Sequence, residues 1–172
     1  MKNLFLTLAL AIGFSMSTQA QTTLQGAESF SVQLPVGFQR TVGANDLASV
    51  QWENTEEELY GYIIFENVDE LKMNEIGTDI KTYATLALND FNSLKNFKLI
   101  DTKTYKTDAG KETLAQVFSY YNEDLEMDIY LQINVYKTAQ FIYKMISYGD
   151  EATFKQSSTH IDFITKKIKF PS

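Results

Sequence analysis

The sequence has no cysteine, one histidine and two prolines among its 172 residues. Without cysteine, a disulfide framework, a thiol nucleophile and a zinc–cysteine site are all excluded. A Ser-His-Asp triad or a histidine-rich metal site would have to use His160, the only imidazole. Because the prolines stand only at positions 35 and 171, no proline-rich linker divides the chain.

Positive charge is also scarce. The chain has 15 Lys and Arg against 22 Asp and Glu, a formal net charge of -7. Nucleic-acid binding needs a basic surface, so we expect no nucleic-acid partner. The sequence has no GxSxG, HExxH, phosphate-loop or dinucleotide motif. We therefore predict no cofactor and no metal.

Residues 1–20 read as a cleavable signal peptide. Lys2 is followed by an apolar run over residues 4–14, and Thr18-Gln19-Ala20 supplies small residues at the cleavage positions. We expect cleavage between Ala20 and Gln21, and a protein exported to the bacterial periplasm or secreted. The alternative is an uncleaved membrane anchor, which eleven apolar residues are too short to form, since a span needs about 20.

The remaining chain has the size of one ordinary domain. We expect residues 21–27 to form a flexible lead-in and residues 28–172 to form a single monomeric domain. No later apolar run approaches membrane length, so the mature chain is expected to have no transmembrane segment.

Strand signals dominate the mature chain. In residues 124–136, Leu, Met, Ile and Val alternate with polar residues over twelve positions, which indicates a strand with one face in the core. Asp108-Ala109-Gly110-Lys111 is typical of a hairpin turn. The expected strands are 30–34, 49–53, 60–67, 97–107, 112–121, 124–136 and 140–148.

Two segments change to a helical period. One apolar stripe runs from Ile80 to Leu94, with Thr78 as the expected N-cap, and a second runs from Phe154 to Ile168. Short turns join the last four strands into an antiparallel meander. The predicted class is α+β, an antiparallel sheet of about seven strands with two main helices.

This order of elements, together with FSVQLPVGF at residues 30–38, resembles the PsbP-like α/β/α sandwich. The features that carry the resemblance are the opening strand ending in Leu34-Pro35-x-Gly37-Phe38, the mid-chain helix, the long hairpins and the closing helix with Ile168 and Phe170. The superfamily includes photosystem II accessory subunits, a nuclear-import factor that binds the GTPase Ran, and exported bacterial proteins of unknown role. The resemblance implies a binding or accessory protein, and it carries over no catalytic residues.

Polar residues offer few candidates for chemistry. His160 is expected within the second helix without a partner for acid–base work. Asp124, Glu126 and Asp128 share one face of the expected strand, where they would either hold a calcium ion or, as we expect, form a solvated sheet edge. Residues 56–58 are three glutamates for which we expect a solvated turn, with calcium or a basic partner as the alternative.

Tyrosine is the more informative excess, with ten in the chain. Tyr130 and Tyr136 fall on the polar face of the 124–136 strand, and an apolar ring with a polar tip suits a contact surface. We name both as candidate partner-binding residues. The alternative is that a helix covers this face, so that the two tyrosines belong to a second core layer.

The sequence thus predicts an exported, non-enzymatic binding or accessory domain of the envelope or the extracellular space. Its partner would be an envelope protein or a small ligand. Two other functions stay open, a carboxylate-based hydrolase and a structural component of an envelope assembly.

Overall fold

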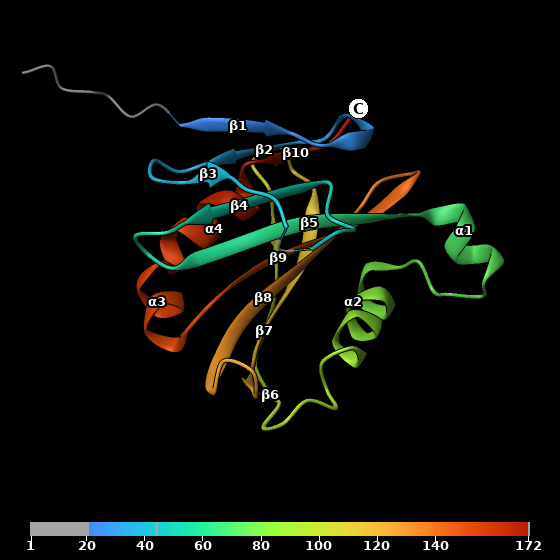
Figure 1. Ribbon diagram of the computed structural model, residues 1–172. Helices are drawn as coiled ribbons and strands as arrows, with labels where there is room; N and C mark the ends of the chain where they lie inside the picture. The colour runs from blue at the N-terminus through green and yellow to red at the C-terminus, as the bar shows by residue number, and fades with distance from the viewer. Residues whose placement is uncertain (1–20, 44, 172) are drawn as a thin grey trace, which may run out of the picture.

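The computed structural model describes residues 21–43 and 45–171 (Figure 1). Strands alternate with helices in the predicted order, but the strands are more numerous. The helices are η1 Ala27–Ser29, α1 Val68–Met73, α2 Ile80–Asn89, α3 Glu151–Gln156 and α4 Ser158–Lys166. The strands are β1 Thr22–Gln25, β2 Ser31–Leu34, β3 Gln39–Arg40, β4 Val50–Asn54, β5 Leu59–Asn67, β6 Lys98–Lys106, β7 Glu112–Asn122, β8 Met127–Lys137, β9 Phe141–Gly149 and β10 Ile168–Lys169.

Seven strands form one antiparallel sheet in the order β3-β4-β5-β9-β8-β7-β6. The last four strands in sequence are neighbours, as the short turns between them require. A second sheet of three short strands, β1-β2-β10, lies above the large sheet in Figure 1. The predicted α+β class and the seven-stranded antiparallel sheet are confirmed.

The large sheet separates two cores, and strand β8 contributes side chains to both. Ile129, Leu131, Ile133 and Val135 are buried under α1 and α2, as the alternation predicts. We call this side of the sheet the α2 face. The other side, the α4 face, packs on α3, α4 and the small sheet through an apolar cluster that includes Trp52. Both faces of the sheet are therefore covered, which makes an α/β/α sandwich.

The first long helix differs from its prediction at both ends. Its N-cap is Asp79 rather than Thr78, because the Asp79 carboxylate accepts the Thr82 N–H at 2.9 Å. The helix ends at Asn89, so Phe91 and Leu94 lie in the turns that follow it. Its buried residues, Tyr83, Ala84 and Ala87, nevertheless fall on the expected stripe.

The second predicted helix is two helices. It breaks at Ser157, which ends α3 and begins α4, and Ile168 belongs to strand β10 rather than to the helix. Ile161 and Ile164 are buried as expected. The one apolar stripe therefore spans a short helix, a longer helix and a strand.

The flexible lead-in expected at residues 21–27 is wrong for most of its length, because Thr22–Gln25 pair with Ser31–Leu34 of β2. Leu24 is buried between exposed neighbours, so a single apolar side chain anchors this strand. The predicted cleavage site follows Ala20, which lies outside the described residues, whereas Gln21 is the first of them. Within the described ranges, no helix is long and apolar enough to cross a membrane.

Candidate functional site

Tyr136 does not lie on a free surface. Its side chain is fully buried on the α4 face, and its hydroxyl donates to the Thr165 carbonyl of α4 at 3.1 Å. Burial raises the pKa of Tyr136 well above its ordinary value, so the hydroxyl remains a donor. The prediction of Tyr136 as a partner-binding residue is therefore wrong, because a helix covers this face and Tyr136 belongs to a second core layer.

Tyr130 is half-buried on the same face. Its ring centroid lies 6.2 Å from that of Phe154 in α3, and burial raises the pKa of its hydroxyl, with the nearby Glu151 acting in the same direction. Helix α3 therefore covers part of Tyr130. Its role in binding stays a prediction.

The acidic group around Asp124 lies in a turn rather than along a strand. Strand β8 begins only at Met127, so Asp124 and Glu126 belong to the β7–β8 turn, and Leu125 is 61% exposed. Asp128 is exposed at the start of β8. Strand β8 lies between β7 and β9, so these carboxylates are not on an edge strand. The expectation of a solvated sheet edge is therefore wrong. Among the described residues, no group of three or more His, Cys, Asp or Glu side chains could hold a metal ion.

Glu57 of the β4–β5 turn is half-buried, although a solvated turn was expected there. It also contacts His160, for which no partner was expected. The Ser157 hydroxyl donates to Glu57 Oε2 at 2.7 Å, and His160 Nδ1 lies 3.0 Å from the same oxygen. Burial acts to raise the pKa of Glu57, but these two hydrogen bonds and the charge of His160 hold it below its ordinary value. The glutamate is therefore held ionised at the junction of α3 and α4.

This arrangement cannot work as a nucleophilic triad. The hydroxyl and the imidazole both point at one carboxylate oxygen, whereas a triad needs the imidazole to accept the hydroxyl proton. Ser157 is also only 3% exposed, so its oxygen is closed to a substrate. The three residues tie the β4–β5 turn to the helix junction.

A cluster of tyrosines on the α2 face was not identified from the sequence. Tyr60 and Tyr148 are paired across β5 and β9, and their rings stack with centroids 5.6 Å apart. The Tyr62 ring meets Tyr148 edge-on at 6.2 Å. Tyr120 of β7 contributes a fourth hydroxyl, since its electrostatic influence reaches both Tyr62 and Tyr148. We call these four half-buried side chains the tyrosine cluster.

The hydroxyls of Tyr62 and Tyr148 stay protonated at neutral pH. Burial, helped by the nearby hydroxyls of Tyr62 and Tyr60, raises the pKa of Tyr148 to about 12. Burial also raises the pKa of Tyr62, although a hydrogen bond with Asn45 opposes the shift. The cluster therefore presents aromatic rings together with neutral hydrogen-bonding groups, the combination that favours aromatic residues at contact surfaces.

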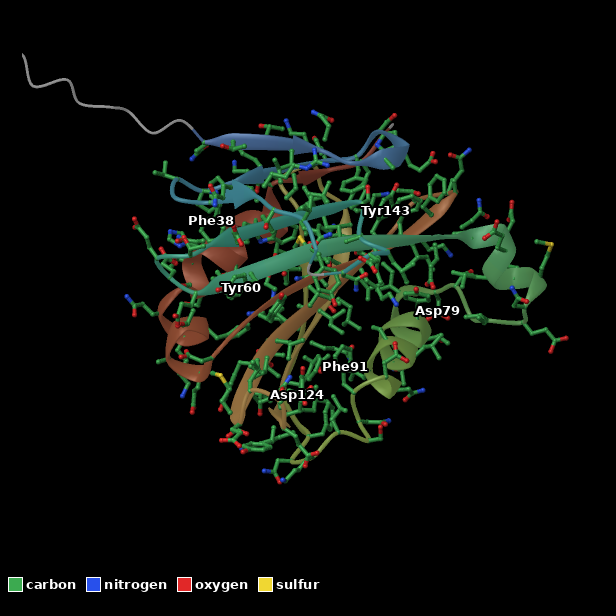
Figure 2. The ribbon with its side chains drawn as sticks, viewed as in Figure 1. Phe38, Tyr60, Asp79, Phe91, Asp124 and Tyr143 are labelled. Atoms are coloured by element: carbon green, nitrogen blue, oxygen red, sulfur yellow. The ribbon has the colours of Figure 1, made fainter. Side chains whose placement is uncertain are left out.

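Helix α2 packs over β7 and β8, and the side chains of the tyrosine cluster keep part of their surface exposed. The turn that follows α2 brings Phe91 to 6.2 Å from the Tyr120 ring (Figure 2, where Phe91 and Tyr60 are labelled). Tyr120 also lines an open hollow of about 600 Å³. The other residues of that hollow are Ser93, Leu94, Lys95, Tyr121, Asn122, Glu123 and Asp124.

The sequence did contain a signal for this site. Tyr60 and Tyr62 are two positions apart in an expected strand, so they had to share a face. What the sequence could not provide is the pairing of β5 with β9, which brings Tyr148 beside them. The order of strands in the sheet was needed to join residues so far apart in the chain.

No family model matches this sequence, and no match is found among curated proteins. Several solved structures are similar over most of the chain. PsbP (CyanoP) from Synechocystis sp. PCC 6803 has a TM-score of 0.60 at 10% identity, covering 91% of this chain and 96% of that protein. LpqN of Mycobacterium tuberculosis, described as involved in cell envelope biogenesis, has a TM-score of 0.62 at 10% identity over 88% and 91% of the two chains. A protein of unknown function from Pseudomonas aeruginosa has a TM-score of 0.54 at 11% identity over 88% and 97%.

These similarities extend across both cores of the sandwich, and identities this low establish the shared fold alone. They confirm the resemblance seen in the opening strand, the mid-chain helix and the long hairpins. The chain has the PsbP-like α/β/α sandwich fold.

Proposed function

We propose that this protein is an exported, non-enzymatic binding domain that acts in the bacterial envelope or outside the cell and holds a protein partner through the tyrosine cluster. The observation that carries the proposal is the group of four half-buried tyrosines on the uncovered part of the α2 face. Aromatic side chains that keep part of their surface in water are enriched at protein contacts and dominate their energetics.

The openness of the site favours a protein over a small ligand. Small ligands bind in concave sites that bury most of their surface. The tyrosine cluster instead lies on a sheet face, and the hollow beside Tyr120 is open and lined by Lys95, Glu123 and Asp124 as well as aromatic rings. A partner that covers the cluster would gain ring contacts at its centre and hydroxyl hydrogen bonds around them.

Carboxylate chemistry receives no support from the geometry. A glycosidase needs one carboxyl whose pKa is raised so that it can act as a general acid. The carboxyls whose pKa is shifted among the described residues are Glu57, Asp79 and Glu151, and in each case the pKa is lowered. These pKa shifts give no support to a hydrolase. Its support for an envelope role is the likeness to LpqN, a protein involved in cell envelope biogenesis.

Site-specific photo-crosslinking tests the tyrosine cluster. Benzoylphenylalanine replaces Tyr60 in one variant and Tyr148 in another, because its ring keeps the aromatic packing of the site. Thr102, an exposed residue of the edge strand β6, is the matched control position. We expect one discrete adduct with the same envelope protein from both tyrosine positions and none from Thr102.

Equal adducts from all three positions, or none from positions 60 and 148, would contradict the proposed binding site. Turnover of a substrate by the purified protein, abolished by one acidic substitution, would contradict the non-enzymatic role.

A further inference from the structure

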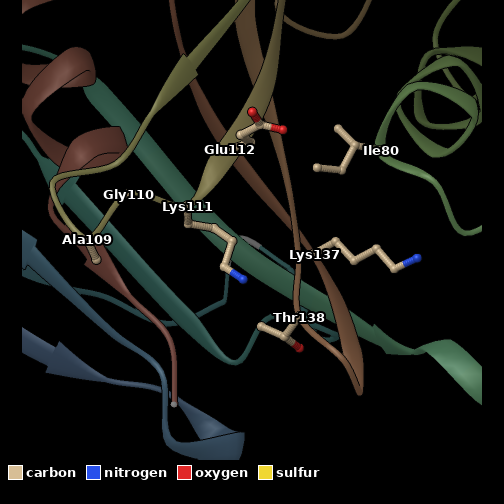
Figure 3. Close-up of a pocket in the computed structure, with 7 residues that line it drawn as sticks. All are labelled: Ile80, Ala109, Gly110, Lys111, Glu112, Lys137 and Thr138. Atoms are coloured by element: carbon tan, nitrogen blue, oxygen red, sulfur yellow. The ribbon is translucent and has the colours of Figure 1, made fainter.

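Five lysines gather at the end of the sandwich opposite the acidic β7–β8 turn, in a chain that is acidic overall. They line three open hollows of about 560, 300 and 470 Å³, which share residues of the β6–β7 and β8–β9 turns. Figure 3 shows two of these lysines, Lys111 and Lys137, beside the hollow of about 560 Å³. We call Lys111, Lys137, Lys166, Lys167 and Lys169 the lysine end.

Three segments distant in sequence build the lysine end. The β6–β7 turn is held to the end of α4, because the Asp108 N–H donates to the Lys166 carbonyl at 3.0 Å and Lys167 Nζ lies 2.7 Å from Asp108 Oδ2. The β8–β9 turn follows Lys137, whose ammonium donates to Thr78 Oγ1 at 3.3 Å. Lys137, Lys166 and Lys169 lie in β8, α4 and β10, and Lys111 lies in the β6–β7 turn. The lysines therefore lie on packed elements of the fold rather than on a free tail.

Two carboxylates, Asp108 and Glu112, line the same hollows, and Asp108 is already paired with Lys167. Five lysines against two carboxylates leave a positive excess at these hollows. Glu66 and Glu70 line the neighbouring hollow beside Phe141, whereas Glu123, Asp124, Glu126 and Asp128 lie at the far end of β7 and β8. Asp124 is at the bottom of Figure 2, whereas the small sheet is at the top. The eleven residues of β8 span about 33 Å.

A separation of this size decides how the charges act. The Debye length at physiological ionic strength is about 8 Å, so salt screens the acidic turn from anything bound at the lysine end. The acidic β7–β8 turn therefore does not prevent this end from binding an anionic surface.

The chemistry of the lysine end suits a surface that carries many anionic groups better than a single bound anion. All five cations are lysines, which act as hydrated point charges, whereas a single phosphate or carboxylate is recognised most specifically by the planar fork of arginine. The hollows are open, and no large hydrophobic side chain exposed in the described residues lines them. Binding there would depend on charge without insertion of an apolar wedge.

We propose that the lysine end docks the domain reversibly on a membrane surface that carries anionic phosphate headgroups. The acidic β7–β8 turn then points away from that surface. Each lysine near the surface strengthens attachment to anionic lipid about fivefold. The three positive charges that remain after Asp108 and Glu112 are counted suffice for weak docking that high salt abolishes.

Vesicle sedimentation tests the docking, using residues 21–172 with vesicles of phosphatidylcholine alone or with 30% phosphatidylglycerol. We expect binding only to the anionic vesicles, with loss of binding at 0.5 M NaCl. The variant Lys111→Gln with Lys169→Gln should bind about 25-fold more weakly. The control Lys95→Gln with Lys155→Gln changes the net charge equally, but its lysines pair with Glu123 and Glu151. It should bind like the unchanged protein.

Equal weakening by both double variants, or no binding to anionic vesicles, would overturn the proposal. Binding to soluble polyglutamate but not to vesicles would do the same, since it would identify an acidic protein as the partner. Competition by inorganic phosphate at constant ionic strength would show a single-anion site and would also contradict surface docking. None of these outcomes depends on the tyrosine cluster.

Discussion

At the scale of single residues, the α4 face of the sheet combines apolar packing with buried polar groups. Gln132 donates to Asn134 Oδ1 at 3.0 Å, and the Tyr105 hydroxyl donates to the same oxygen. Tyr136 donates to the backbone of α4. The first two bonds join side chains of β6 and β8, and the Tyr136 bond holds α4 against the sheet. Losing such a bond costs free energy, because a buried polar group is then left without its partner.

Replacing Tyr136 with phenylalanine tests this contribution. The change keeps the ring and leaves the Thr165 carbonyl without the hydroxyl donor. We expect the free energy of unfolding to fall by about 1–3 kcal/mol. Urea titration measures it, with fluorescence of the single, buried Trp52 as the signal. Tyr130→Phe, at a half-buried hydroxyl, should change it by less than about 0.5 kcal/mol, and a similar loss in both variants would contradict this role of Tyr136.

Leu131 tests the other core. It is 4% exposed on the α2 face, and truncation to alanine should cost about 2–5 kcal/mol through lost transfer energy and a cavity. Asp128→Ala in the same strand should cost less than about 0.5 kcal/mol, because Asp128 is exposed. Urea titration measures both changes. Equal small losses of unfolding free energy would contradict the assignment of Leu131 to the core and of Asp128 to the surface.

Residues such as Ile129 and Leu131 could be predicted because a two-residue period fixes the face of a strand without knowledge of its neighbours. The burial of Tyr136 could not be predicted, because the polar face of a strand has the same sequence pattern whether water or a helix covers it. The tyrosine cluster was missed for a related reason. Its members lie on β5, β7 and β9, and only the order of strands in the sheet brings these together.

At the scale of elements, the break between α3 and α4 is held by a residue of a distant turn. Glu57 accepts from Ser157 and His160, one at the break and one in the first turn of α4. The sequence shows a single apolar stripe from Phe154 to Ile168, and it contains no proline or glycine between these residues to indicate the break. The contact that holds the break joins residues 100 positions apart, so no local pattern reveals it. For this reason the sequence predicted one helix there.

The lowered pKa of Glu57 predicts how this contact responds to acid. A carboxyl whose folded-state pKa lies below its unfolded value of 4.5 stabilises the fold above that pH. This stability is lost as the pH falls through the folded pKa. Glu57→Gln should therefore lower the urea midpoint at pH 7, and the difference from the unchanged protein should shrink as the pH falls from 4.5 toward 3.

Glu56→Gln, at the exposed neighbouring position, is the control and should leave the midpoint unchanged at both values of pH. A difference at Glu57 that persists unaltered at pH 3 would show that the side chain acts through packing rather than charge.

At the scale of the whole molecule, the sequence predicted the class and six strands of the large sheet, because alternating segments and helical stripes leave few ways to bury every apolar face. The predicted strand at residues 30–34 pairs in the small sheet instead, and the two-residue strand β3 completes the large one. The small sheet itself could not be predicted, because strands of two to four residues show almost no period. Leu24 and Ile168, two buried residues far apart in the chain, each pack in the same core cluster as Val32 of β2. Neither has a long pattern around it.

Processing of the chain can be measured directly. We predict cleavage after Ala20, so the exported protein should begin at Gln21, one residue before β1. Intact mass of the protein recovered from the soluble exported fraction should equal that of residues 21–172. Recovery of the full-length chain from the membrane fraction would contradict the prediction.

The small sheet also sets a condition on when folding can finish. Strand β2 lies between β1 and β10, so a segment near the start of the described chain has one neighbour close by and the other near residue 168. Because a chain is synthesised from its N-terminus, β2 remains unpaired on one edge until the last part of the chain has emerged. We therefore expect a chain truncated before Ile168 to be cut by proteases more readily than the full chain, because β2 then lacks one of its two partners.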